Sequence, residues 1–256
     1  MKFGGASVAT PESFSQVADI IVERLKTTSS IVVVVSAMGG STDELIGLAK
    51  KVHPKPPERE QDMLISAGER ISIALLAMAL ANKGVEAKSF TGSQSGIITT
   101  CDHSNAKIVD VRPHRILKTL KEGKVAIVAG FQGMSTEGEI TTLGRGGSDT
   151  SAVAIAIAVS ADCVEFYKDV AGVYSHDPKR EEKAILYEKL SYQEAIDIVR
   201  QGAKVLHARS VQLAQKNLLP LHVLSFCSHL RKQYGGTLIT EEFKMKIENK
   251  LYEEIL

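Results

Sequence analysis

Three short runs of β-branched residues constrain the fold of this chain more than any other feature. They lie at Ile31–Val35, Val125–Ala129 and Val164–Tyr167, and helical patterns or turn residues bound each of them. Continuous apolar runs of this length are typical of parallel strands that are buried on both faces. Amphipathic segments separate them. The sequence therefore predicts an α/β fold in which helices cover both faces of a parallel sheet.

Four of the predicted helices lie before, between or after these strands. Thr10 is expected to cap the first helix, with Pro11 at its first position, and this helix should run to about Lys26. The other three are expected at Met63–Asn82, Leu190–Arg200 and Ala208–Lys216. The polar segments His53–Gln61 and Lys179–Lys183 predict surface loops.

Composition excludes several classes of function. A net charge of +1 over 256 residues indicates neither nucleic acid nor an anionic membrane as a partner. Three scattered cysteines predict no disulfide framework, and no Cys or His spacing predicts a metal site in the protein. Residues 1–20 lack a signal-peptide pattern, and the longest apolar run, Ala152–Val159, is too short to span a bilayer. We therefore expect a cytoplasmic protein.

The first candidate motif is Gly4-Gly5, which follows Lys2 and precedes the first predicted helix. A glycine pair between a strand and a helix lets backbone N–H groups approach an anion, and the lysine adds a positive charge beside the loop. The motif is not a Walker A loop, because Gly-x-x-x-x-Gly-Lys-Ser/Thr is absent. An ordinary structural turn is an equally weighted alternative.

The second candidate motif is the glycine-rich segment 141–152. Its glycines surround Arg145, an arrangement that suits bidentate binding of a carboxylate. Ser148 and Asp149 then begin an alanine-rich helix. Gly144-x-Gly146 is not a dinucleotide fingerprint, because Asp149 occupies the third glycine position and would repel a pyrophosphate.

Two further segments have turn-rich patterns. Lys168-Asp169 end the third predicted strand, where α/β sheets commonly bind ligands, and Tyr174 in the following loop is either a base-stacking or a packing residue. Lys204 lies at a turn between two predicted helices, and Gly235-Gly236 predict a tight turn into a final strand.

Together these motifs resemble those of aspartokinases, in the family's order and over positions 2–237. The matching segments are Lys2-Phe3-Gly4-Gly5-x-Ser7-Val8, Val35-Ser36-Ala37-Met38, Ser66-x-Gly68-Glu69, Leu143-Gly144-Arg145-Gly146-Gly147-Ser148-Asp149, the loop from Asp169 to Pro178, Lys204-Val205-Leu206-His207 and Gly236-Thr237. The Gly-Arg-Gly-Gly-Ser-Asp segment distinguishes aspartokinases from related acetylglutamate, glutamate, carbamate and uridylate kinases.

The resemblance implies a three-layer α/β/α amino acid kinase fold, like that of carbamate kinase, with a mainly parallel eight-stranded sheet. Residues 1–240 would form the catalytic domain, with an N-terminal lobe for the amino acid and a C-terminal lobe for the nucleotide. Residues 241–256 would form a C-terminal amphipathic helix with Phe243, Ile247, Leu251 and Ile255 on one face. Because the kinase motifs end at Thr237, we expect a chain without ACT domains that is insensitive to lysine and threonine.

The resemblance also implies a role for each matching residue. Lys2 would contact the transferred phosphoryl group, and Asp149 would orient Lys2. The phosphate path would be lined by Gly4, Gly5, Ser7 and Ser36. Aspartate would be held by Thr42, Glu69, Arg145 and Ser148. The ATP site would be lined by Lys2, Lys168, Asp169, Tyr174, Lys179, Lys204 and Val205.

The implied reaction is phosphorylation of the β-carboxylate of L-aspartate by ATP with Mg²⁺, in a homo-oligomer. No general base is required, because this carboxylate is ionised at pH 7. Four positions depart from the family pattern: Ala6, Lys168, Lys179 and Ala208. A lysine at position 179 cannot make the bidentate clamp of the usual arginine.

Two alternatives remain open at this stage. One is an enzyme of the same fold that acts on another acid, and the other is a non-catalytic subunit that binds a nucleotide or an amino acid. Glu69 also has a structural alternative as an ordinary helix-surface acid.

Overall fold

The computed structural model describes residues 1–181, 183–241 and 250–253. Its main sheet has eight strands in the order β10-β12-β11-β9-β1-β2-β6-β3. Their bounds are β1 Lys2–Phe3, β2 Val32–Val35, β3 Ala87–Phe90, β6 Val125–Ala129, β9 Val164–Lys168, β10 Lys189–Leu190, β11 Leu221–Ser225 and β12 Thr237–Ile239. All neighbours are parallel except β11 and β12. The mainly parallel eight-stranded sheet is thus confirmed.

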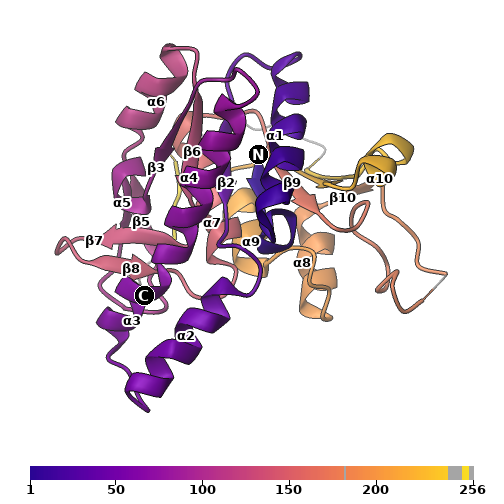
Figure 1. The fold of residues 1–256 in the computed structure, drawn as a ribbon. Helices are drawn as coiled ribbons and strands as arrows, with labels where there is room; N and C mark the ends of the chain where they lie inside the picture. Colours follow the sequence, from indigo (N-terminus) through magenta and orange to yellow (C-terminus); the bar gives the residue numbers. More distant parts are fainter. Residues whose placement is uncertain (182, 242–249, 254–256) are drawn as a thin grey trace.

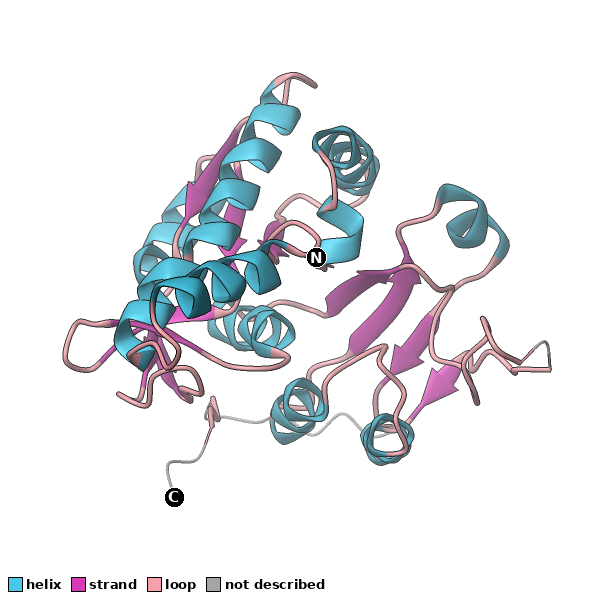
Figure 2. Cartoon of the chain, turned by 60° about the horizontal axis from the view of Figure 1, so that its bottom comes forward, coloured by secondary structure: helices cyan, strands magenta, loops and turns pink. Residues whose placement is uncertain are grey.

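Helices cover both faces of this sheet, as the alternating pattern predicts. On one face, α1 (Pro11–Leu25) and α4 (Ala67–Ala81) pack against each other and against a core that includes Val33, Val35 and Ile127. On the other face, α7 (Gly147–Val159), α8 (Tyr192–Arg200) and α9 (Ala208–Lys216) enclose a second core. Figure 1 shows α1 and α4 side by side, and Figure 2 shows helices on either side of the strands.

A second sheet of four short strands, in the order β5-β4-β7-β8, was not predicted from the sequence. The bounds are β4 Ile97–Thr99, β5 Ile108–Val111, β7 Gln132–Ser135 and β8 Ile140–Thr142. Its strands are three or four residues long, and they mix polar residues with apolar ones. Strands this short carry little periodicity, which explains why they escape prediction. The chain leaves β8 directly into the glycine-rich turn around Arg145.

Most of the predicted elements are confirmed. The strand at Val125–Ala129 and the helix at Ala208–Lys216 have the predicted bounds, and the other two predicted strands differ by one residue at one end. The first helix begins after Thr10 and ends at Leu25. Gly236, with φ +83°, makes the predicted turn into β12.

The predicted helix Met63–Asn82 is wrong as a single element. The chain forms α3 (Glu58–Ile65) and α4, with a break at Ser66. At this break the Ser66 carbonyl oxygen accepts a hydrogen bond from the side-chain amide of Gln132, 2.9 Å away, which belongs to β7 of the second sheet. Because α3 already begins at Glu58, the predicted loop His53–Gln61 is too long.

Other differences concern short elements and the end of the chain. Leu190 belongs to β10, and Ser191 caps α8 through a capping box. Helix α2 (Ser41–Val52) was not predicted, and the remaining short elements are η1 Gly5–Val8, α5 Gly92–Ser95, α6 His114–Lys121 and α10 Ser228–Gln233. The predicted C-terminal helix falls largely on residues 242–249 and 254–256, which lie outside the described residues.

One helical stretch meets the length and hydropathy criteria for a membrane span. Residues 58–81 include an 18-residue window with a mean hydropathy of 1.6, of which 44% is buried. The stretch comprises α3 and α4, is interrupted at Ser66, and packs on α1, β3 and β6. A core helix passes the same test, so this stretch carries no argument for a membrane.

Candidate active site

A pocket of about 760 Å³ lies where the carboxyl ends of β1, β2 and β9 meet the second sheet. Parallel α/β sheets bind their ligands at this edge of the sheet. The volume is in the range of small-molecule sites. Nine residues expected in the site line this pocket: Lys2, Gly5, Ser36, Thr42, Glu69, Arg145, Ser148, Asp149 and Lys168.

The alternation of side chains along the strands places two lysines beside one aspartate. Lys2 on β1 is in register with Phe166 on β9, so Lys168, two residues further along, points to the same face of the sheet. Helix α7 packs on this face, and its first turn carries Asp149. The Asp149 carboxylate lies 2.5 Å from Lys2 Nζ and 3.3 Å from Lys168 Nζ. The predicted pairing of Asp149 with Lys2 is therefore present in the geometry.

Burial and charge act in opposite directions on this cluster. Burial alone would raise the pKa of Asp149, but the ammonium groups of Lys2 and Lys168 outweigh it and lower that pKa to about 2. Burial lowers the pKa of Lys168, although Asp149 opposes this change. The cluster thus places one carboxylate between two lysine side chains.

Lys2 is a buried residue of the main sheet. It belongs to β1, between β2 and β9, and only 4% of its surface is exposed. The neighbouring Phe3 points to the opposite face and stacks on Tyr167, with ring centroids 4.6 Å apart. Both residues of β1 are therefore fixed by the centre of the sheet.

Glu69 lies in the first turn of α4 and is 2% exposed. Its Oε1 accepts a hydrogen bond from the Ala37 N–H at 3.0 Å, and Oε2 has no partner among the residues that the structure describes. Burial raises the pKa of Glu69 to about 7, although the Ala37 N–H and the charge of Lys2 lower it. A Cβ atom at Gly68 would lie 2.8 Å from the Ala37 Cβ, so the glycine permits the close approach in which the Ala37 N–H reaches Glu69.

Arg145 projects from a turn that two glycines shape. Gly144 and Gly146 have φ values of +70° and +73°, in the left-handed region. A Cβ atom at Gly146 would lie within 2.1 Å of the His207 ring, so only glycine fits there. Arg145 itself is exposed, and within the described part of the chain no carboxylate lies at ion-pair distance from it. Its guanidinium group is therefore free to bind a carboxylate from solution.

Two helices begin at the pocket and add to its positive character. Helix α2 follows Gly40, which has φ +81°, and its first turn places Thr42 at the pocket wall. Helix α7 begins at Gly147, directly after the Arg145 turn. Helix N-termini carry free N–H groups and the positive end of the helix dipole, so both ends favour an anionic ligand.

The remaining expected site residues do not line this pocket. Gly4 and Ser7 lie just behind it, and the Ser7 hydroxyl donates to the Gly4 carbonyl at 2.6 Å. Asp169 and Lys179 form an exposed ion pair at 2.5 Å in the loop after β9, where Tyr174 bridges to Leu186. Lys204 and Val205 lie between α8 and α9. The assignment of Asp169, Tyr174, Lys179, Lys204 and Val205 to the nucleotide stays a prediction.

The pocket wall also contains residues for which the sequence predicted no role in binding or catalysis. They are Ala37, Met38, Gly39, Gly40, Asp43, Ile46, Gln61, Ile65, Ser104, Phe131, Thr142, Gly144, Gly146 and Gly147. Gln61 and Ile65 of α3, together with Ser104 and Phe131, lie outside every segment that the sequence offered as a motif. Asp62 on α3, whose side chain is fully buried, was also not predicted as a site residue. The sequence shows it only as an acidic residue next to an apolar helical segment.

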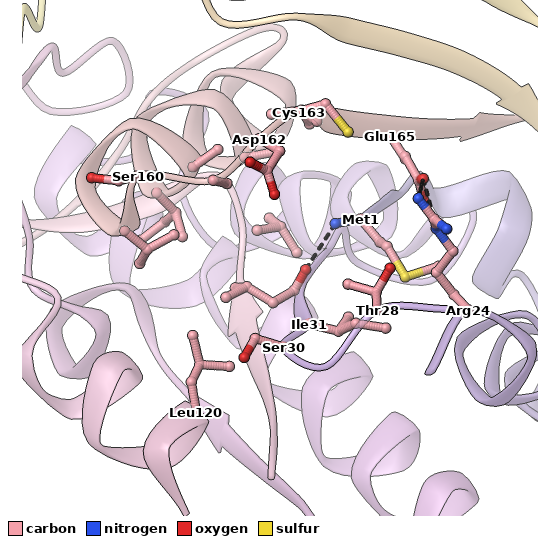
Figure 3. A pocket seen from close by; sticks show the side chains of 18 residues that line it. Met1, Arg24, Thr28, Ser30, Ile31, Leu120, Ser160, Asp162, Cys163 and Glu165 are labelled. Atoms are coloured by element: carbon pink, nitrogen blue, oxygen red, sulfur yellow. Dashed lines mark hydrogen bonds and ion pairs between the residues drawn. The ribbon is translucent and has the colours of Figure 1, made fainter. Parts of the chain in front are cut away.

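A second cavity, of about 270 Å³, lies at the opposite edge of the sheet (Figure 3). Three of its charged groups already have partners within the protein. Arg24 forms an ion pair with Glu165 at 2.7 Å, and the Met1 ammonium group donates to the Val32 carbonyl at 2.8 Å. The cavity adjoins the amino ends of β2 and β9, away from the edge where α/β sheets bind ligands. We therefore take the first pocket as the candidate active site.

Comparison with known proteins decides the family. The profile of the amino acid kinase family matches residues 1–225. The chain belongs to the amino acid kinase family. Its fold agrees: the solved structure of Synechocystis aspartate kinase has a TM-score of 0.83 and 44% identity, over 96% of this chain and 40% of that one.

Aspartokinases are prominent among the relatives, which confirms the resemblance found in the motifs. The aspartokinase of Corynebacterium glutamicum is 52% identical over 239 residues, which are 93% of this chain and 56% of that protein. Escherichia coli aspartokinase III, solved in complex with aspartate and ADP, has a TM-score of 0.84 and 26% identity over 95% of this chain and 64% of that one. The chain spans about half the length of the curated relatives it matches.

Proposed function

We propose that this chain transfers the γ-phosphoryl group of ATP to the β-carboxylate of L-aspartate, giving 4-phospho-L-aspartate and ADP, the first step toward the aspartate-family amino acids. The observation that carries this proposal is the pairing of two unsatisfied groups in one pocket. Among the residues that the structure describes, Glu69 Oε2 has no hydrogen-bond partner and Arg145 has no carboxylate at ion-pair distance. Together they match the two charged groups on the α-carbon of an amino acid.

The proposed step is a direct displacement at phosphorus. An oxygen of the β-carboxylate forms a bond to the γ-phosphorus, and the bond from that phosphorus to the bridging oxygen breaks. The bridging oxygen leaves with the electron pair as part of ADP. No proton is transferred, because the attacking carboxylate is already ionised at neutral pH. Catalysis therefore requires positioning and neutralisation of negative charge, not a general base.

Lys2 and Lys168 supply the neutralising charge. Asp149 holds both amines, and its own negative charge persists because its pKa is about 2. We assign Lys2 to the transferred phosphoryl group. Lys168 is a second cation on the same side of the sheet. Gly5 and Ser36, which line the pocket, complete the proposed phosphate path. Gly4 and Ser7 are proposed to shape this path from behind, through the hydrogen bond from the Ser7 hydroxyl to the Gly4 carbonyl.

Arg145 and Glu69 fix the direction of the substrate. We assign Arg145 to the α-carboxylate, which its planar group can bind through two parallel hydrogen bonds. Glu69 Oε2 takes the α-ammonium group. Thr42 and Ser148, both in the pocket wall, are the proposed hydrogen-bonding residues for the remaining oxygens. With both ends of the α-carbon held, the β-carboxylate is the group left to face the phosphate.

ATP is proposed to enter as its Mg²⁺ complex. The described parts of the chain hold no cluster of three or more His, Cys, Asp or Glu side chains that could bind a metal ion, and the Asp149 carboxylate in the pocket is engaged by two lysines. Mg²⁺ commonly binds through substrate phosphates, water and one or two carboxylates, so the ion is expected to travel with the nucleotide. The adenosine part is assigned to the loop after β9 and the α8–α9 connection, and a homo-oligomer remains the proposed assembly.

A panel of acceptors tests this proposal. Release of ADP from Mg²⁺-ATP is measured with L-aspartate, with L-glutamate and without an acceptor. We expect release that depends on aspartate and is much slower with glutamate, whose extra methylene displaces the side-chain carboxylate. Faster turnover with glutamate would assign the site to another amino acid. Equal ADP release with and without acceptors would contradict an amino acid kinase function.

A further inference from the structure

Asp62 is a fully buried carboxylate that gathers hydrogen bonds from two distant segments of the chain. It lies on α3 and has no exposed surface. Its donors come from Thr142 at the end of β8 and from residues 103 and 104 in the connection between β4 and β5. A buried charge with this many donors fixes the segments that donate to it, since each donor would otherwise lose its partner.

The bonds to Thr142 act on the start of the Arg145 turn. The Thr142 hydroxyl donates to Asp62 Oδ1 at 2.6 Å, and the Thr142 N–H donates to Oδ2 at 3.0 Å. Two residues later the chain enters the left-handed conformation of Gly144, and Arg145 follows. Asp62 thus fixes the position of Thr142, which immediately precedes the Leu143-Gly144-Arg145 turn.

The bonds to the other segment act on the support beneath the same turn. His103 Nδ1 lies 2.9 Å from Asp62 Oδ2, and the Ser104 N–H donates to that oxygen at 3.0 Å. A Cβ atom at Gly144 would lie 3.0 Å from Asn105 Oδ1 and 3.1 Å from the Ser104 carbonyl oxygen. The turn therefore rests directly on the segment that Asp62 anchors.

Asp62 is connected to the other side of the substrate site through the backbone of α3. The Ser66 N–H closes the last turn of this helix on the Asp62 carbonyl at 3.1 Å, and Ser66 joins α3 to α4, whose first turn carries Glu69. We infer that Asp62 is a positioning residue that sets the separation between Arg145 and Glu69, and thereby the affinity for the amino acid. This inference rests on the proposed function, because it assigns those two residues to one substrate.

The test is the variant Asp62→Asn. Asparagine keeps the shape of the side chain but replaces one carboxylate oxygen by an NH2 group. That NH2 group cannot accept the hydrogen bonds that the Thr142 and Ser104 N–H groups donate to Asp62 Oδ2 in the unmodified chain. We expect KM for aspartate to rise about tenfold or more while KM for ATP stays within about twofold, since small misplacements of a substrate-binding group are costly. A merely structural role would lower stability without separating the two constants.

Glu165→Gln is the matched control. Glu165 is also a buried carboxylate with several donors, from Arg24 and Tyr167, but it lies at the amino end of β9. The control should lower the melting temperature and leave both KM values unchanged within about twofold. If Asp62→Asn does not fold, Thr142→Val removes a single donor to Asp62 and should raise KM for aspartate in the same direction to a smaller extent.

Two failures can be told apart in this experiment. Absence of aspartate-dependent turnover in the unmodified chain would refute the proposed function. Turnover in the unmodified chain, with KM for aspartate and KM for ATP changed equally or not at all in Asp62→Asn or Thr142→Val, would refute the positioning role alone.

Discussion

The raised pKa of Glu69 predicts a specific pH dependence of substrate binding. Burial in the first turn of α4 raises this pKa from 4.5 to about 7. The ammonium group of aspartate would bind the ionised form. Below pH 7 the free site is increasingly protonated, and kcat/KM for aspartate should fall as the pH falls.

The magnitude follows from the titration of a single group. With a pKa near 7, about nine-tenths of the free sites are protonated at pH 6, and few are at pH 8. We therefore expect kcat/KM for aspartate to be roughly tenfold lower at pH 6 than at pH 8. At saturating aspartate the bound ammonium group keeps Glu69 ionised, so kcat should change much less.

The assay is aspartate-dependent ADP release between pH 6 and 8 in the unmodified chain and in Glu69→Gln. In the variant this residue does not titrate, so the profile for aspartate should be flat and the activity at pH 8 low. The dependence on ATP concentration, measured on the same samples, serves as the control for ionisation of the nucleotide. A flat profile in the unmodified chain, or an unchanged slope in Glu69→Gln, would refute the reasoning.

The same group makes a prediction for stability. Because the pKa of Glu69 is higher in the folded chain than in the unfolded chain, the folded chain binds more protons between pH 4.5 and about 7. The free energy of unfolding should therefore fall as the pH rises through this window, by up to about 3 kcal/mol. Glu69→Gln should have a higher melting temperature than the unmodified chain at pH 8, and a lower one would contradict this account.

Three further variants test the charges in the pocket. Lys2→Met should lower kcat about 10²-fold or more and also destabilise the fold, because it removes one of the two cations paired with the buried Asp149; near-normal kcat would refute its role. Lys168→Thr should lower kcat less, since Lys168 lies farther from Asp149, and a larger loss than in Lys2→Met would reverse the two assignments. Arg145→Lys should raise KM for aspartate about tenfold and leave KM for ATP unchanged, because lysine lacks the planar fork; a change in KM for ATP instead would place Arg145 at the nucleotide.

The main sheet was predictable because its strands are buried on both faces. Val125–Ala129, for example, is apolar throughout, and burial on both sides allows little else. The second sheet lacks this signal, since β7 consists of a glutamine, a glycine, an exposed methionine and a serine. Its position depends on contacts with distant segments, which local patterns do not record.

The site was predictable where glycines or charges interrupt a regular pattern. Arg145 and Asp149 stand out in a glycine-rich segment, and Lys2 precedes a glycine pair. The burial of Lys2 was not predictable, because the two strands that enclose it come from residues 32–35 and 164–168. Asp62 escaped notice for the same reason: its partners lie about 40 and 80 positions away along the chain.

The identity of the product tests the central claim most directly. An acyl phosphate formed from aspartate reacts with hydroxylamine to give a hydroxamate, which mass spectrometry and comparison with authentic standards can assign to one carboxyl group. The account predicts the β-hydroxamate of aspartate, formed in proportion to the ADP released and lost in Lys2→Met. The α-hydroxamate, or ADP release without any hydroxamate, would contradict transfer to the β-carboxylate.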